Sequence, residues 1–142
     1  MPLRFALFIA SALAAMTPCP ASAVERAGPP LELIAGNVRD LPYTAVVEIT
    51  GAEKADELRG YVRFRVQASV IETIKGKAVD HIEYFETHEA PSKGPMWPSR
   101  VLVSLREAPD GTLFAPDNGY VFPANDAVIR EARKAAGGPR SR

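Results

Sequence analysis

The sequence predicts a mainly β protein: a small antiparallel barrel of five to six strands with a C-terminal helix. Residues 61–70 alternate strictly between polar and apolar side chains, the pattern of a strand with one buried face. Shorter runs rich in β-branched residues follow it, separated by turn sequences that contain glycine and proline. Helical spacing occurs only near the two ends, so helices should cover a β core and not form it.

The first 23 residues are organised like a secretory signal peptide. Arg4 supplies a positive start, residues 5–16 are apolar and uncharged, and Ala21-Ser22-Ala23 has the small-x-small pattern that signal peptidase reads. The apolar run is shorter than the about 20 residues that a membrane-spanning helix needs. We therefore expect a periplasmic or secreted protein with no integral membrane segment after cleavage. Lipid attachment at Cys19 is the alternative.

Removal of residues 1–23 leaves 119 residues, the length of one domain. The chain has 17 acidic residues and, without Arg4, 16 basic ones, so the mature net charge is −1. Such a chain has no long-range field to attract nucleic acid, and we expect no nucleic-acid partner. The only cysteine, Cys19, leaves with the signal peptide. The cysteine-free mature domain therefore has no disulfide, no thiol chemistry and no cysteine metal ligand.

Four segments are predicted: a signal peptide (1–23), an N-terminal segment (24–42), a β-barrel domain with its C-terminal helix (43–136) and a disordered tail (137–142). In the N-terminal segment, Leu31, Ile34, Val38 and Leu41 have helical spacing, but Gly36-Asn37 is a turn signal. A short helical turn ending before Gly36 is expected.

Residues 43–50 predict a strand, and the charged residues 51–59 predict a loop before the long strand. Ile71 and Ile74 are three apart, which breaks the alternation and predicts a bulge that bends this strand. Gly76 can adopt positive φ in the turn that follows.

The rest of the barrel is expected from several shorter segments. These are a strand at 79–88 with Ile82 and Tyr84 on one face, a proline-rich loop at 90–99, a strand at 100–105, a tight turn at 108–111, and two short strands at 112–115 and 120–122 around a turn at 116–119. A helix should begin after Asn125 as N-cap, present Val128, Ala132 and Ala135/Ala136 on one face, and end at Gly137-Gly138-Pro139.

The strand that runs into a Lys-Gly turn at residues 70–76, followed by Val101-Leu102-Val103, resembles secreted OB-fold proteins of the netrin and tissue-inhibitor type. The resemblance covers about residues 43–105 and implies an OB-like barrel. That family is cross-linked by cysteines, and its metalloprotease inhibitors chelate zinc through an N-terminal cysteine. The expected mature domain has no cysteine, so the inhibitory mechanism does not carry over.

Two histidines lie among acids in residues 80–83 and 86–89, a composition that suits zinc. On a regular strand, however, His81 and Glu83 share one face, while Glu86 and His88 share the other. No Gly-x-Ser-x-Gly elbow or phosphate-binding glycine loop occurs in the sequence, and no partner is indicated for either histidine as a base.

The sequence therefore predicts a non-enzymatic binding or accessory domain without a cofactor, whose unknown partner is a protein or small molecule outside the cytoplasm. The alternative is a small extracytoplasmic metal-binding protein that uses His81, Glu83 and His88.

Two groups of residues are candidates for binding. The polar face of the long strand carries Tyr61, Arg63 and Arg65, as on OB-type surfaces that hold an anionic chain. The alternative is that both arginines pair with cross-strand acids such as Glu48 or Glu83. The second group, Met96 and Trp97, lies in the proline-rich loop, where the indole either anchors a partner or caps the barrel, with Met96 and the prolines as a stiff apolar lid.

We predict that the mature protein begins at Val24, because the small residues before it define the cleavage site. Intact-mass spectrometry of the protein expressed in a bacterial host checks this. Retention of residues 1–23, or a lipid on Cys19, would contradict the prediction.

Overall fold

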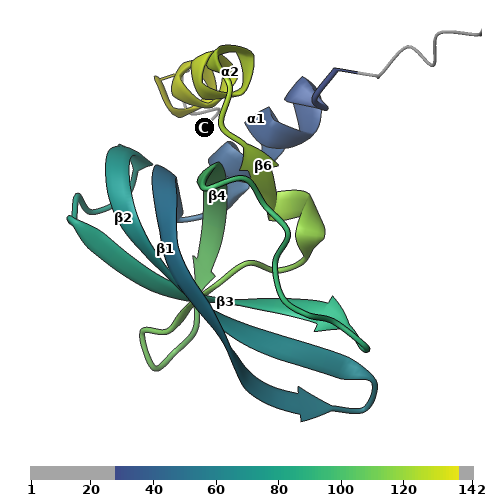
Figure 1. The fold of residues 1–142 in the computed structure, drawn as a ribbon. Coiled ribbons are helices and arrows are strands. Elements are labelled where there is room, and N and C mark those ends of the chain that lie inside the picture. Colours follow the sequence, from purple (N-terminus) through teal and green to yellow (C-terminus); the bar gives the residue numbers. More distant parts are fainter. Residues whose placement is uncertain (1–27, 138–142) are drawn as a thin grey trace, which may run out of the picture.

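The structure is a computed structural model that describes residues 28–137; the expected signal peptide and residues 138–142 of the expected tail lie outside the described residues. Figure 1 shows a strongly curved sheet with two helices together at one end. The elements are α1 (Leu31–Asp40), β1 (Tyr43–Leu58), β2 (Tyr61–Lys75), β3 (His81–Glu89), β4 (Arg100–Glu107), β5 (Leu113–Phe114), the 3₁₀ turn η1 (Asn118–Tyr120), β6 (Val121–Pro123) and α2 (Asp126–Gly137).

The sheet closes on itself. The strand order is β1-β2-β3-β5-β4-β6, and an additional pairing of β1 with β4 joins the first five strands in a ring. All pairings are antiparallel except that of β3 with β5, which is parallel. The prediction of a mainly β, OB-like barrel with a C-terminal helix is confirmed, and the parallel pairing is the one departure from an antiparallel barrel.

The long strand β2 has the expected pattern, with Val62, Phe64, Val66 and Ala68 buried. Of the four irregularities in its pairing with β1, two skip one residue of β2. Val46 and Val47 pair with Glu72 and Val70, which leaves Ile71 as an extra residue, and the next irregularity leaves Ile74 as another. The predicted bulge is confirmed at both isoleucines, and it bends β2 so that one strand can serve two sides of the ring.

The prediction of a loop at residues 51–59 is wrong, because β1 continues to Leu58 and pairs with β2 along this whole stretch. Arg59 and Gly60 form the two-residue turn with φ of 52° and 83°, the positive values that a type I′ hairpin requires. The charged residues 53–57 form a strand because their partners on β2 include Arg63 and Arg65, which offset their charge.

The prediction for α1 is also wrong, since the helix runs through Gly36 and Asn37 to Asp40. Ile34 and Val38 are buried along one stripe of this helix. Asn37 is buried too, and its Nδ2 donates to the carbonyl oxygen of Gly119 at 2.7 Å. Burial of this stripe outweighs the about 1 kcal/mol that a glycine costs within a helix.

Both helices cover the outer side of β1 and β4. One core cluster fills the barrel interior, and a second joins Val46 of β1 and Leu102 of β4 to residues of α1 and α2. These two strands are therefore buried on both faces, at residues 43–47 and 101–105. This part of the sheet therefore separates the barrel interior on one side from the two helices on the other.

The expected N-cap of α2 is confirmed, because Oδ1 of Asn125 accepts a hydrogen bond from the backbone N–H of Val128 at 3.0 Å. Its buried face is wider than predicted and includes Ile129, whereas Ala136 is exposed. Arg133 binds both carboxylate oxygens of Glu72, at 2.8 and 2.6 Å, and so ties α2 to β2. This guanidinium lowers the pKa of the Glu72 carboxyl.

The remaining elements follow the sequence closely. β3 and β4 begin and end within about two residues of the expected strands, residues 90–99 form a loop, and Gly76 has a φ of 99°. The strand expected at 112–115 shrinks to β5, β6 is shifted by one residue from the expected 120–122, and η1 begins in the expected turn and extends to Tyr120. No helix within residues 28–137 is long and apolar enough to cross a membrane.

We expect Phe64→Ala to lower the free energy of unfolding by about 3–5 kcal/mol, as loss of a buried aromatic ring does. Phe64 is 4% exposed and packs edge-to-face on His88, with 5.6 Å between the ring centroids. Urea unfolding followed by far-UV circular dichroism measures the change. Ile71→Ala, on the same strand but exposed, is the control and should cost less than about 1 kcal/mol. An equal effect of both substitutions would contradict the assignment of the two faces of β2.

Candidate functional site

The outer face of β2 and β3 gathers the residues that the sequence singled out on the long strand. Both strands alternate strictly, so the same register that buries Val66 and Tyr84 turns their neighbours outward. The outward rows, written β2 against β3, are Tyr61 with Glu89, Arg63 with Thr87, Arg65 with Phe85, Gln67 with Glu83 and Ser69 with His81. Tyr61, Arg63 and Arg65 thus lie on one continuous surface.

This surface is hollowed along its length by four adjoining pockets of about 390 to 530 Å³ each. The first lies at the tip of the β1–β2 hairpin and shares Arg63 and Thr87 with the second, which reaches β5 and the loop before it. The second shares Phe85 with the third, and the third shares His81 and Glu83 with the fourth. We call this run of pockets, from Tyr61 to His81, the outer track.

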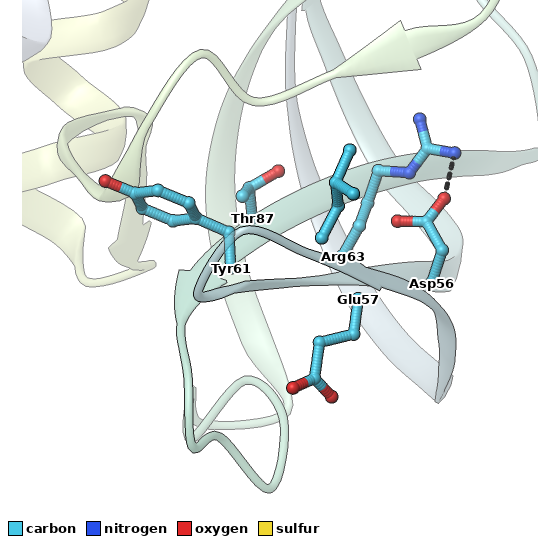
Figure 2. A pocket seen from close by; sticks show the side chains of 6 residues that line it. Asp56, Glu57, Tyr61, Arg63 and Thr87 are labelled. Atoms are coloured by element: carbon cyan, nitrogen blue, oxygen red, sulfur yellow. Dashed lines mark hydrogen bonds and ion pairs between the residues drawn. The ribbon is translucent and has the colours of Figure 1, made fainter.

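Arg63, which lines the outer track, and Arg65 beside it are each paired with an acid. Figure 2 shows Arg63 reaching Asp56 of β1, at 2.5 Å, while the ring of Tyr61 points the other way. Arg65 lies 3.3 Å from Glu53 and 3.6 Å from Glu83. The expectation that the arginines pair with cross-strand acids is therefore confirmed, with Glu83 as one of the named partners. Such exposed pairs contribute about 0–1 kcal/mol to stability, but they hold the guanidinium groups in place.

Aromatic rings alternate with these ion pairs. Phe85 lies under both guanidinium groups, with the Cζ atoms of Arg63 and Arg65 at 4.8 and 5.9 Å from its ring centroid. Phe114 of β5 is the register partner of Phe85 and lines the same pocket, and Tyr61 is 52% exposed. Sequence reasoning missed Phe85 and Thr87 as site residues, although alternation from Ile82 and Tyr84 places both outward.

The inner face of β3 holds a buried carboxylate, that of Glu86. Glu86 is only 3% exposed and has three hydrogen-bonding neighbours. The hydroxyl of Tyr84 donates to Oε1 at 2.9 Å, Nε1–H of Trp97 donates to Oε2 at 3.0 Å, and Nε2 of His88 lies 3.0 Å from Oε2. Burial, together with the adjacent Glu86 charge, raises the pKa of Tyr84, so this phenol remains a donor.

The loop at residues 90–99 contacts the barrel interior through the side chain of Trp97. Trp97 is half-buried and packs against the interior cluster, as the capping interpretation expects. Met96 is 95% exposed, so the expectation that it forms part of an apolar lid is wrong. The hydrogen bond from Trp97 to Glu86 ties this loop to β3.

The residues of the metal-binding alternative lie on different faces of β3. His81 and Glu83 line the outer track, whereas His88 lies inside beside Glu86. Within residues 28–137, no group of three or more His, Cys, Asp and Glu side chains is arranged to hold a metal ion. Comparison of the sequence with models of known protein families and with curated proteins finds no match.

We predict that Trp97→Ala lowers the free energy of unfolding by about 3 kcal/mol, the lower end for a large aromatic residue because Trp97 is half-buried. It is the only tryptophan, so its emission reports on this loop and should be blue-shifted and poorly quenched by iodide. Met96→Ala, next to it and exposed, should change stability by less than about 0.5 kcal/mol. A red-shifted, freely quenched tryptophan would contradict the cap.

Proposed function

We propose that this chain is an exported, non-catalytic binding or accessory domain that holds an extended ligand along the outer track. The observation that carries the proposal is the continuity of the four pockets, each of which shares lining residues with the next. From His81 to Thr87 the track follows β3 for about 20 Å, taking about 3.3 Å per residue. A run of this length suits a chain molecule better than a compact metabolite, which prefers one enclosed cavity.

The rigidity of the platform supports binding. β2 is paired with β1 on one side and with β3 on the other throughout the track, so the backbone carrying Tyr61 and Arg63 is fixed. Asp56 and Phe85 further restrict the guanidinium of Arg63. A surface whose side chains are already ordered loses less conformational entropy when a ligand binds.

The polar groups of the track support a binding role. The nearest approach to a nucleophile and base is Ser69 Oγ at 3.4 Å from His81 Nδ1, and both residues lie on the outer face of the sheet. In the described part of the chain, no carboxylate is hydrogen-bonded to His81 to orient it as a base. Export is supported by the signal-peptide pattern of residues 1–23.

An array carrying oligosaccharides and peptides, probed with the mature protein, tests the proposal. We expect at least one class of feature to be bound, and Arg63→Ala or Phe85→Ala to weaken that signal by about tenfold, which corresponds to about 1.4 kcal/mol. Arg133→Ala is the matched control, because Arg133 is also an exposed arginine paired with a carboxylate, but on α2. Binding that the track variants leave unchanged, binding that Arg133→Ala weakens equally, or no binding to any feature would overturn the proposal.

A further inference from the structure

The carboxylates of the outer track are already engaged within the protein. The acids that line the pockets are Asp56, Glu57, Glu83 and Asp110. Asp56 is paired with Arg63, Glu57 with Lys54 and Glu83 with Arg65. Asp110 accepts a hydrogen bond from the backbone N–H of Thr112 at 2.9 Å. The track therefore offers no unopposed block of one charge with which to attract a polyelectrolyte.

These pairs still leave hydrogen-bonding capacity unused. An ionised carboxylate has about four lone-pair sites and a guanidinium has five N–H donors, so one ion pair uses only part of each. A ligand hydroxyl both accepts and donates. It can accept a hydrogen bond from an N–H of Arg63 and donate one to the carboxylate of Asp56 without separating this ion pair. A cationic side chain could donate to the same lone pairs, but Arg63 and Lys54 already offset the charge of these acids, and a further exposed pair would gain only about 0–1 kcal/mol.

Rings and polar groups lie side by side along the track. Moving along the rows from the hairpin tip, the ring of Tyr61 is followed by the Arg63–Asp56 pair, then by the ring of Phe85 beside Arg65, then by Glu83 with Gln67. Successive rows are two residues, hence about 6.6 Å, apart. Ring surface therefore lies next to clustered donors and acceptors within this stretch, which suits a ligand that presents both C–H faces and hydroxyl edges.

We infer that the outer track binds a neutral, hydroxyl-rich oligomer, a linear oligosaccharide. This inference rests on the proposed binding function and names its ligand class. A basic peptide is the competing occupant, and the internal pairing of the acids disfavours it. An anionic chain is disfavoured further, because acids outnumber the one arginine among the lining residues.

The test titrates the ¹⁵N-labelled mature protein with three neutral hexasaccharides (cellohexaose, maltohexaose and chitohexaose) and with two charged probes, hexalysine and a heparin-derived hexasaccharide. We expect at least one neutral hexasaccharide to give saturable amide shifts at Tyr61, Arg63, Phe85 and Thr87. Its affinity should change less than about twofold when sodium chloride rises from about 0.05 to about 0.5 M, because salt screens charge and not hydrogen bonds or ring contacts.

Two variants separate contact from folding. Tyr61→Ala should weaken hexasaccharide binding by about tenfold, as loss of an exposed ring at a binding surface does. Ile71→Ala removes a similarly exposed apolar side chain from the same strand outside the track and should leave binding unchanged. Both residues are exposed, so both variants should remain folded.

The outcomes distinguish the two proposals. If a charged probe binds the track more tightly than every neutral hexasaccharide, the ligand class is wrong and the binding function stands. The same conclusion follows if a neutral hexasaccharide binds away from the track while a charged probe shifts the amide signals of the track residues. If no probe of any class shifts the track residues, the oligosaccharide inference and the proposed function both fail.

Discussion

The register between β2 and β3 is the constraint on which both surfaces of the barrel depend. With Arg65 opposite Phe85 and Val66 opposite Tyr84, the register packs Val66 and Tyr84 inside the barrel and places Arg65 and Phe85 together on its outer face. A slip of one residue would reverse the faces of β3, exposing Tyr84 and turning Phe85 inward, away from the two arginines. The hydrogen bond from Trp97 to Glu86 opposes such a slip, because it forms only while the Glu86 carboxylate faces inward. One buried acid thus helps to fix both the interior packing and the outer track.

Local sequence patterns predict the parts of the fold whose determinants lie within a few residues of one another. Alternation predicts β2, the spacing of Ile71 and Ile74 predicts its bulges, and Asn125 predicts the start of α2. The sequence does not predict that β1 continues through residues 51–58, because the charged residues in this stretch become a strand only when β2 supplies their partners. The length of α1 was missed for the same kind of reason, since Asn37 is satisfied by Gly119, 82 residues away.

For the candidate site, too, the sequence predicts which residues share one face of a strand, but not the contacts made through loops. Strand alternation alone brings Tyr61, Arg63 and Arg65 to one face, and applied to β3 it would have added Phe85 and Thr87. Spacing within the chain could not show that Trp97 reaches Glu86, because that contact depends on the path of an irregular loop. It also could not show that β5 lies beside β3, which brings Phe114 next to Phe85 and extends the track beyond β2 and β3.

The short strand β5 has a consequence for the mechanics of the barrel. It closes the ring with two register pairs to β3 and two to β4, whereas β2 and β3 share nine. Opening at this seam therefore requires less free energy than opening elsewhere in the ring. Phe85 and Phe114 stand on opposite sides of the seam, within one pocket. A ligand that contacts both rings would bridge the seam, so occupancy of the track would stiffen the barrel as well as fill its surface.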